Sequence, residues 1–559
     1  MMNYKKYKKF ETVKLKDRTW PDNEITKAPI WCSVDLRDGN QALITPMNIE
    51  EKIEMFQMLV DMGFKEIEVG FPSSSQIEYD FLRALIDRQL IPDDVIVQVL
   101  TQAREHLIRR TFESLKGLKK AIVHIYNSTS VLQRDVVFGM DKEQIKQIAV
   151  EGTRLVKSLT SEFDGEVILE YSPESFTGTE MDYAVEICDA VMDEWEATEN
   201  KKVIINLPST VEMNTPNVYA DQIEYCCRNF KNRNRVIVSV HPHNDRGCGV
   251  ASTELALLAG ADRVEGTLFG NGERTGNVDI INVAMNMFTH GIDPKLNMSD
   301  MNAIKGVYER VTKMEVGPRH PYAGQLVFTA FSGSHQDAIN KGMRAYHERN
   351  TGTWEVPYLP IDPADLNRQY EPIVRINSQS GKGGVAFVMD TTYGFRLPKA
   401  MQQDFSKSIQ KITEAEGEIT PERIYQAFDQ EYLTKETPYA FVRYRIEDHH
   451  DTTSENPIKV EITLMDHGNE KTIIGHGNGP IDSVKNALDQ NGYIQTELID
   501  YQEHALASGS SAKAAAYVQL KESASGICEF GAGVDPNINI ASIKAIFSAM
   551  NRIDEKMKK

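Results

Sequence analysis

The chain has 559 residues, which is too many for a single hydrophobic core, so we expect roughly two to four domains. Its hydrophobic content of 41% and charged content of 26% are ordinary for a globular protein. The net charge of −19 argues against a nucleic-acid partner and gives an anionic membrane no electrostatic reason to attract the chain. An anionic small-molecule substrate remains compatible with this charge, because the field inside a site is local.

The cysteines show neither a disulfide framework nor the spacing of a structural zinc site. None of the six belongs to a Cys-x-x-Cys pair, so free thiols in a reducing compartment fit best. The first thirty residues contain no apolar signal-peptide segment, and no apolar run approaches the roughly 20 residues that a membrane helix needs. We therefore expect a cytoplasmic protein without a membrane partner.

From about residue 29 to 290, short β-rich runs alternate with longer helical patterns. The eight β-rich runs are Ile30–Val34, Glu66–Val69, Val95–Leu100, Ala121–Tyr126, Val167–Tyr171, Val203–Leu207, Val236–Val240 and Arg263–Leu268. The helical patterns lie near 49–61, 76–88, 103–115, 141–161, 180–197, 217–230, 249–259 and 279–289. This count favours a (β/α)8 TIM barrel over an open doubly wound sheet, which usually has fewer strands. We expect a catalytic barrel with an N-terminal extension over residues 1–324.

Residues 325–437 break this rhythm and are typical of small linker subdomains, with one helical pattern near 399–414. The run Gly381–Gly384 superficially resembles a phosphate-binding P-loop. Position 376 is Ile where that motif needs Gly, and no Ser or Thr follows Lys382. We therefore expect a turn at this run.

Residues 438–559 contain a weak internal repeat, which predicts an α+β domain made of two similar halves. In each half, two strand-like runs lead to a Gly-x-Gly segment and then to a helix. The two segments open Gly475–Pro480 and Gly531–Pro536, and we expect Gly475–Pro480 to be a loop before its helix. A loop that precedes a helix is a suitable place for a small carboxylate to bind.

Several metal-ligating residue types follow the predicted barrel strands. Asp38 follows the first strand, His241 and His243 the seventh, and Asn277 the eighth. Barrel enzymes place their active sites at the carboxyl ends of the strands, and closure makes the eighth strand a neighbour of the first and the seventh. One carboxylate, two imidazoles and one amide oxygen suit a divalent cation, with Mg²⁺ favoured and Mn²⁺, Co²⁺ or Zn²⁺ also compatible. The alternative is a hydrogen-bonded histidine pair at a strand end.

Three further residues at strand ends are candidates for chemistry. Arg37 is a permanent cation beside Asp38, suited to stabilising an oxyanion or, alternatively, to a salt bridge. Glu174 follows the fifth strand and could act as a base, although exposed glutamates are common in loops. Thr210 follows the sixth strand and could bind a carboxylate or cap the next helix.

With these residues identified, the chain resembles the α-isopropylmalate synthase family over essentially its whole length. The motifs that carry the resemblance are Asp35–Leu43, Tyr171–Glu174, Leu207–Thr210, His241–Gly247, Gly270–Asn277, Ser332–Ala338, Val356–Pro360 and Gly475–Pro480. The wider group often has an acidic residue after the glycine of the first motif, where this chain has Asn40. That departure resembles the long fungal and actinobacterial form.

The resemblance implies a metal-dependent condensation of acetyl-CoA with 2-oxoisovalerate, giving 2-isopropylmalate and CoA, the first committed step of leucine synthesis. Arg37 would stabilise the oxyanions, and Glu174 and His335 would form a candidate pair for proton removal, with Tyr358 nearby. Because His335 and Tyr358 lie outside the barrel, the resemblance also implies a homodimer with shared sites. The pocket for the branched keto acid would contain Leu100, Ser172, Asn206 and Thr210.

The C-terminal repeat resembles the leucine-sensing domain of this family, so leucine is the expected inhibitor. The residues that map to the leucine site are Gly477, Asn478, Gly479, Tyr501 and Ala505. The alternatives are a sibling synthase that makes citramalate or homocitrate, a metallohydrolase, and a leucine sensor without enzymatic activity. A hydrolase is disfavoured because that class usually carries its His-x-His pair on the first strand.

Overall fold

The computed structural model describes residues 4–6, 10, 12–330, 333–370, 382–417, 419–448, 457–506 and 512–558. The chain divides into two compact units, each of which is described by itself. The first comprises Met1–Phe328 with Ile361–Gln369, and the second comprises Thr329–Pro360 with Tyr370–Lys559. No helix in the described ranges is long and apolar enough to cross a membrane.

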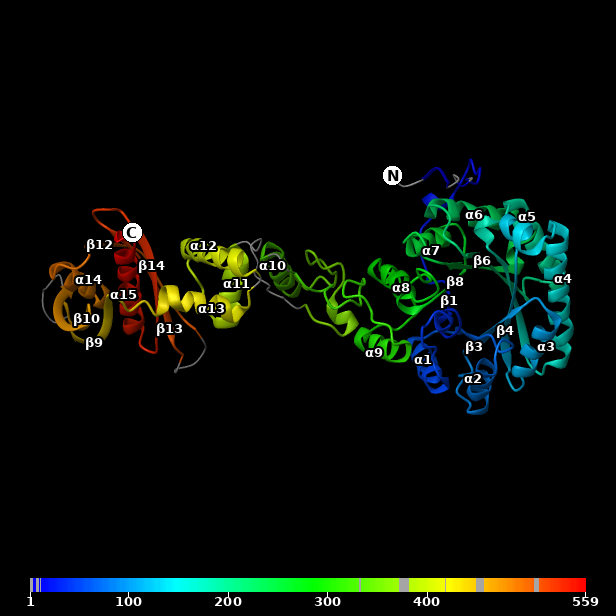
Figure 1. The fold of residues 1–559 in the computed structure, drawn as a ribbon, viewed down its shortest axis with the longest axis horizontal. Helices are drawn as coiled ribbons and strands as arrows, with labels where there is room; N and C mark the ends of the chain where they lie inside the picture. Colours follow the sequence, from blue (N-terminus) through cyan, green and yellow to red (C-terminus); the bar gives the residue numbers. More distant parts are fainter. Residues whose placement is uncertain are drawn as a thin grey trace. The chain divides into compact units, whose positions relative to one another are not determined.

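The first unit contains a closed barrel of eight parallel strands in sequential order, which confirms the predicted TIM barrel (Figure 1). The strands are β1 Ile30–Ser33, β2 Glu66–Gly70, β3 Ile96–Gln102, β4 Lys120–Ser128, β5 Glu166–Glu174, β6 Val203–Ser209, β7 Val236–Pro242 and β8 Arg263–Gly266. Closure joins β1 to β8, with Ile30 opposite Arg263 and Ser33 opposite Gly266. Strand β8 is shorter than predicted, because the chain turns at Phe269 with a φ of 57°.

One helix follows each strand, and together the helices surround the barrel (Figure 1). They are α1 Ile49–Met62, α2 Gln76–Asp87, α3 Glu105–Ser114, α4 Lys142–Leu159, α5 Met181–Trp195, α6 Pro216–Asn229, α7 Gly249–Leu258 and α8 Ile280–Thr289. Capping boxes at Asn48 and Asp141 fix the starts of α1 and α4. A further helix, α9 Met301–Thr312, begins at the N-cap Asp300 and was not predicted.

The second unit begins with helices rather than strands. They are α10 Gly333–Arg349, α11 Lys382–Tyr393, α12 Lys399–Glu416 and α13 Pro421–Phe428, and α12 confirms the pattern expected near 399–414. The turn expected at Gly381–Gly384 is wrong for its last three residues, because Lys382 begins α11. Gly381 lies outside the described residues.

The two C-terminal halves each contain three antiparallel strands and one helix, so the predicted α+β repeat is confirmed. The first half has the strand order β11-β10-β9 with α14, and the second has β12-β13-β14 with α15. Their bounds are β9 Tyr439–Asp448, β10 Ile458–Asp466, β11 Asn469–Gly477, α14 Pro480–Gln490, β12 Thr496–Ala505, β13 Ala514–Glu522, β14 Cys528–Asp535 and α15 Ile538–Met557. One apolar core joins the halves, with Val460, Val484, Val518 and Ile546 among its members.

Both Gly-x-Gly segments are strand residues, so the loop predicted at Gly475–Pro480 is wrong for its first three residues. Gly475 and Gly477 lie in β11, and Gly531 and Gly533 lie in β14. A Cβ atom on Gly475 would lie 2.2 Å from the Ser483 carbonyl oxygen of α14. One on Gly531 would lie 2.1 Å from the Ala545 carbonyl oxygen of α15. The glycines therefore allow each helix to pack directly on its strand.

Candidate active site

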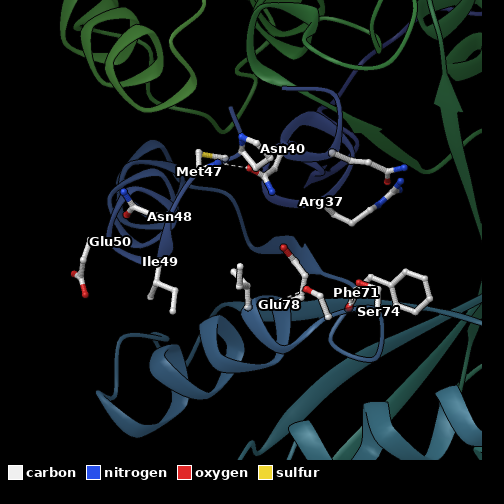
Figure 2. Close-up of a pocket in the computed structure, with 13 residues that line it drawn as sticks. Arg37, Asn40, Met47, Asn48, Ile49, Glu50, Phe71, Ser74 and Glu78 are labelled. Carbon is white, nitrogen blue, oxygen red and sulfur yellow. Dashed lines mark hydrogen bonds between the residues drawn. The ribbon is translucent and has the colours of Figure 1, made fainter. Parts of the chain in front are cut away.

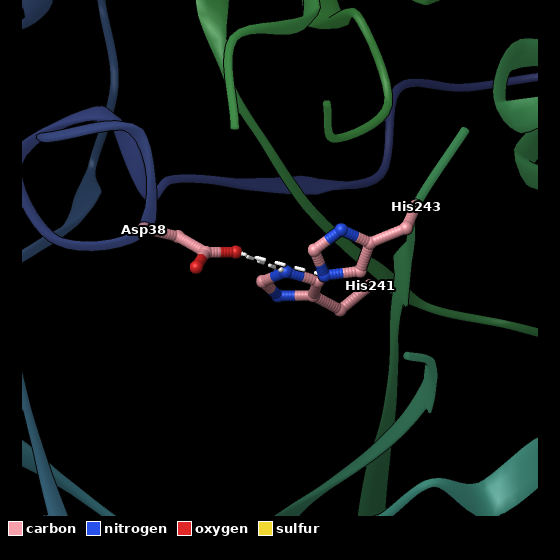
Figure 3. Close-up of side chains that lie close together, drawn as sticks. All are labelled: Asp38, His241 and His243. Atoms are coloured by element: carbon pink, nitrogen blue, oxygen red, sulfur yellow. Dashed lines mark hydrogen bonds and ion pairs between the residues drawn. The ribbon is translucent and has the colours of Figure 1, made fainter. Parts of the chain in front are cut away.

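Asp38, His241 and His243 converge at the carboxyl end of the barrel (Figure 3). The Oδ2 atom of Asp38 lies 3.1 Å from Nε2 of His241 and 3.7 Å from Nε2 of His243. All three residues are buried, and one ligand atom from each lies within 4.8 Å of the others. The structure thus brings together three of the four predicted metal ligands at the carboxyl ends of β1 and β7.

The fourth predicted ligand, Asn277, joins this cluster through its side-chain oxygen. Its Oδ1 atom lies 3.0 Å from Nε2 of His241, and its Nδ2 donates to the Asn271 carbonyl oxygen at 3.0 Å. The amide is therefore oriented with its oxygen toward His241. The loop before Asn277 depends on Gly276, which has a φ of 95° and leaves no room for a Cβ, since that atom would lie 1.9 Å from the Gly270 carbonyl oxygen.

The electrostatics of the cluster favour a bound cation. Burial would raise the pKa of Asp38, but Arg37 and the two imidazoles outweigh it and hold that pKa well below its usual value. Burial lowers the pKa of His243 to about 4, so its ring is neutral and keeps a lone pair for a ligand. Burial alone would also lower the pKa of His241, yet Asp38 and Glu265 raise it to about 9. The oxygen atoms of Asp38 and Asn277 that face Nε2 of His241 are also suitable ligands for a metal ion, so the donor set fits a divalent cation.

Arg37 lies beside the cluster and pairs with two carboxylates. It belongs to a short π-helical segment, Asp35–Gly39, directly after β1. Its Nη1 lies 2.9 Å from Oδ1 of Asp38, and its Nε donates to the fully buried Glu68. The segment is anchored because the Asp35 carboxylate accepts a hydrogen bond from the Leu268 backbone at 3.0 Å. Arg37 is thus a fixed positive charge in the cavity wall.

A cavity of about 350 Å³ opens above the cluster. Its walls contain Asp38, both histidines, Arg37 and the predicted substrate residues Leu100, Ser172, Asn206 and Thr210. The hydroxyl oxygen of Thr210 accepts a hydrogen bond from the Ser175 backbone at 2.9 Å. Helix α6 starts after the N-cap Thr215, so the alternative that Thr210 caps this helix is wrong.

The predicted proton-transfer residues fall in separate places. Glu174 ends β5 and lines the cavity, where its carboxylate accepts a hydrogen bond from the Ser128 hydroxyl. His335 and Tyr358 belong to the second unit and stack on each other, with ring centroids 4.1 Å apart. Tyr358 is 63% exposed, so much of its ring surface is available for contact.

A second hollow, a groove of about 1050 Å³, adjoins this site (Figure 2). It lies between the N-termini of α1 and α2 and has an apolar lining that includes Met47, Ile49 and Ile77. Arg37, Gln41 and Phe71 line both the groove and the cavity. An elongated ligand in the groove would therefore reach the cavity beside Arg37.

Sequence reasoning missed a cluster of charged residues inside the barrel. Arg263 is fully buried, with Nη1 2.6 Å from Glu265 and 3.3 Å from Glu170, and His124 lies 2.9 Å from Glu68. Burial raises the pKa of Glu170 well above its usual value, although Arg263 opposes this. The sequence feature that could have indicated this cluster is the alternation of these charged residues with apolar residues inside strand-like runs.

In the C-terminal repeat, a pocket of about 560 Å³ lies between the two halves. The predicted leucine residues Asn478, Gly479 and Tyr501 line it. Gly477 lies within β11 and Ala505 at the end of β12, and neither belongs to the pocket lining.

Comparisons with known proteins place these features in one family. Residues 28–307 match the HMGL-like family, residues 325–390 the alpha-isopropylmalate synthase post-catalytic domain-like family, and residues 418–554 the LeuA allosteric (dimerisation) domain. The 2-isopropylmalate synthase of Clostridium acetobutylicum is 56% identical, covering 99% of both chains. Those of Rhodospirillum rubrum and Rhizobium johnstonii are 53% and 55% identical, covering 99% and 98% of both chains. The chain therefore belongs to the 2-isopropylmalate synthase family of acyltransferases.

Proposed function

We propose that the chain condenses acetyl-CoA with 2-oxoisovalerate to give 2-isopropylmalate and CoA, the first committed step of leucine synthesis. The observation that carries this proposal is the convergence of Asp38, His241, His243 and Asn277, the first three of which line one cavity together with Arg37. A divalent cation held by these four residues, for which we propose Mg²⁺, would act as a Lewis acid on the keto carbonyl.

The cavity walls suit a branched keto acid. The Thr210 oxygen already accepts a hydrogen bond, so its hydroxyl hydrogen is left to donate to the substrate carboxylate. Asn206 donates to the Ser172 hydroxyl oxygen at 2.9 Å, whereas its own side-chain oxygen has no hydrogen-bond partner among the described residues. Leu100 adds apolar surface, which supports an isopropyl group as the substrate side chain.

The groove between α1 and α2 suits the pantetheine arm of acetyl-CoA, because its lining is apolar and it shares Arg37 with the cavity. Glu174 removes a proton from the acetyl methyl group, and the resulting enolate carbon attacks the keto carbon. Arg37 donates hydrogen bonds to the oxyanions that form in this step. Water then hydrolyses the thioester, which releases CoA.

His335 and Tyr358 complete the proton-transfer group from the second unit. Their mutual stacking supports a joint role. We propose a cytoplasmic homodimer in which each active site uses His335 and Tyr358 from the partner chain. Within each chain, we propose a catalytic barrel at 1–324, linker subdomains at 325–437 and a regulatory domain at 438–559. If sites are shared, a mixture of inactive His335→Ala and Asp38→Ala chains would regain activity, because a mixed dimer contains one site with neither substitution. Full activity of a monomer would rule sharing out.

We propose that leucine inhibits the enzyme by binding in the pocket between the two C-terminal halves. Asn478 and Gly479 precede α14 of the first half, while Tyr501 lies on β12 of the second. A ligand there touches both halves, so its binding can favour one arrangement of the halves over another. Deletion of residues 438–559 should abolish leucine inhibition, and inhibition that survives would place the effector elsewhere.

The keto-acid specificity is tested by measuring CoA release with 2-oxoisovalerate, pyruvate and 2-oxoglutarate in parallel. We expect the highest kcat/KM with 2-oxoisovalerate. A preference for pyruvate or 2-oxoglutarate would identify a citramalate or homocitrate synthase instead.

A further inference from the structure

Glu265 connects the metal ligand His241 to the floor of the keto-acid cavity. Its Oε2 atom lies 2.7 Å from Nδ1 of His241 and 3.3 Å from the side-chain nitrogen of Asn206. Asn206 in turn donates to the Ser172 hydroxyl oxygen at 2.9 Å. One carboxylate oxygen is therefore shared by the candidate metal site and the candidate substrate pocket.

The other oxygen of Glu265 is fixed from below. Its Oε1 atom accepts hydrogen bonds from Arg263 at 2.6 Å and from Gln98 at 3.1 Å. Arg263 is itself fixed, since it donates to Glu66 at 2.5 Å and to the Ser239 hydroxyl at 2.9 Å. Because the Glu265 side chain is fully buried, its carboxylate has no solvent to turn toward.

The contact with Glu265 decides which nitrogen of His241 faces the cluster. A carboxylate only accepts hydrogen bonds, so the hydrogen between the two groups belongs to Nδ1 of His241. The Nε2 atom is then directed at Asp38 Oδ2 and Asn277 Oδ1, which lie 3.1 and 3.0 Å away. His243 has no such anchor, because its Nδ1 makes no hydrogen bond among the described residues.

We propose that Glu265 is a positioning residue, which holds His241 with Nε2 directed at the metal position and, through Asn206, holds Ser172 in the substrate pocket. This inference rests on the metal site of the proposed function. Partners of metal-bound histidines of this kind typically contribute about 10- to 100-fold to metal affinity. Loss of Glu265 should also raise KM for 2-oxoisovalerate, because Asn206 loses its acceptor.

The test compares three full-length variants by Mn²⁺ titration calorimetry of the metal-depleted protein, with circular dichroism and thermal unfolding as checks of the fold. Glu265→Gln removes the charge that orders His241, and Glu265→Asp keeps the charge but is one carbon too short to reach both Arg263 and His241. Glu66→Gln is the matched control, since Glu66 is another buried carboxylate that pairs with Arg263, and no hydrogen bond joins it to His241.

We expect Glu265→Gln and Glu265→Asp to weaken Mn²⁺ binding by about 10- to 100-fold, and Glu66→Gln to stay within about threefold of wild type. If Glu265→Gln fails to fold, Glu265→Asp decides alone. Wild-type affinity in the Glu265 variants, or an equal loss in Glu66→Gln, would overturn the positioning role. Wild-type protein that binds no Mn²⁺ would instead refute the metal site and the proposed function with it.

Discussion

Replacement of Arg37 by lysine keeps the positive charge and removes the several hydrogen-bond donors of the guanidinium group, so it tests the role of those donors. Arg37 contacts Asp38 through Nη1 at 2.9 Å and Glu68 through Nε, and its side chain is only 13% exposed. Lysine has a single nitrogen, so it cannot hold both carboxylates and also donate to an oxyanion. The Glu68 side chain is fully buried, so the lysine is expected to remain with that carboxylate and to leave the oxyanion without a donor.

Removal of one such donor typically lowers kcat by about 10²- to 10³-fold, which corresponds to roughly 2.7–4 kcal/mol of transition-state stabilisation. We expect this loss in Arg37→Lys, with a much smaller change in KM for 2-oxoisovalerate. The assay is steady-state CoA release at saturating Mg²⁺. Arg18→Lys is the control, because Arg18 forms a two-contact pair with Asp221, both contacts at 2.8 Å, and lines neither the cavity nor the groove. A kcat of Arg37→Lys within about threefold of wild type would refute the oxyanion role.

Three other changes test separate parts of the structure. Asn277→Ala removes one ligand oxygen and should weaken Mn²⁺ binding while leaving the thermal unfolding midpoint nearly unchanged; unchanged calorimetric affinity would exclude Asn277 as a ligand. Leu100→Ala enlarges the substrate pocket and should lower kcat/KM for 2-oxoisovalerate by about 10- to 200-fold. If the ratio of kcat/KM for 2-oxoisovalerate to kcat/KM for 2-oxobutyrate does not change, Leu100 does not line that pocket. Gly475→Ala places a Cβ 2.2 Å from the Ser483 carbonyl oxygen and should destabilise the C-terminal domain by about 1–3 kcal/mol. Gly479→Ala is the control, because Gly479 has open space around it and a φ of −162°, so it should accept alanine. Equal denaturant midpoints for the two glycine variants would refute the strand–helix packing argument.

The barrel and its metal cluster could be predicted from the sequence because both depend on local periodicity. Alternating strand and helix patterns located eight units, and the two-residue repeat of β7 placed His241 and His243 on one side of the barrel mouth. Closure then brought Asp38 and Asn277 to them, which is a consequence of topology rather than of any single residue.

The missed features depend on contacts between distant segments. The glycines of β11 were expected to form a loop, since glycine usually marks turns, but they and the glycines of β14 allow α14 and α15 to lie directly on their strands. The roles of Glu265 and Arg263 could not be assigned because each needs partners from other strands, among them His241 and Glu66. Charged residues inside apolar strands indicate such interior clusters, but they do not indicate which residues pair.

We infer that a metal held by Asp38, His241, His243 and Asn277 serves the condensation. The most direct measurement follows ¹³C-labelled acetyl-CoA and 2-oxoisovalerate by NMR, with chelator-treated wild type and Asp38→Ala, before and after addition of Mg²⁺. We predict that labelled 2-isopropylmalate forms only in wild type and only after Mg²⁺ is added. Product at the wild-type rate in Asp38→Ala, or in chelator-treated wild type before Mg²⁺ is added, would contradict it.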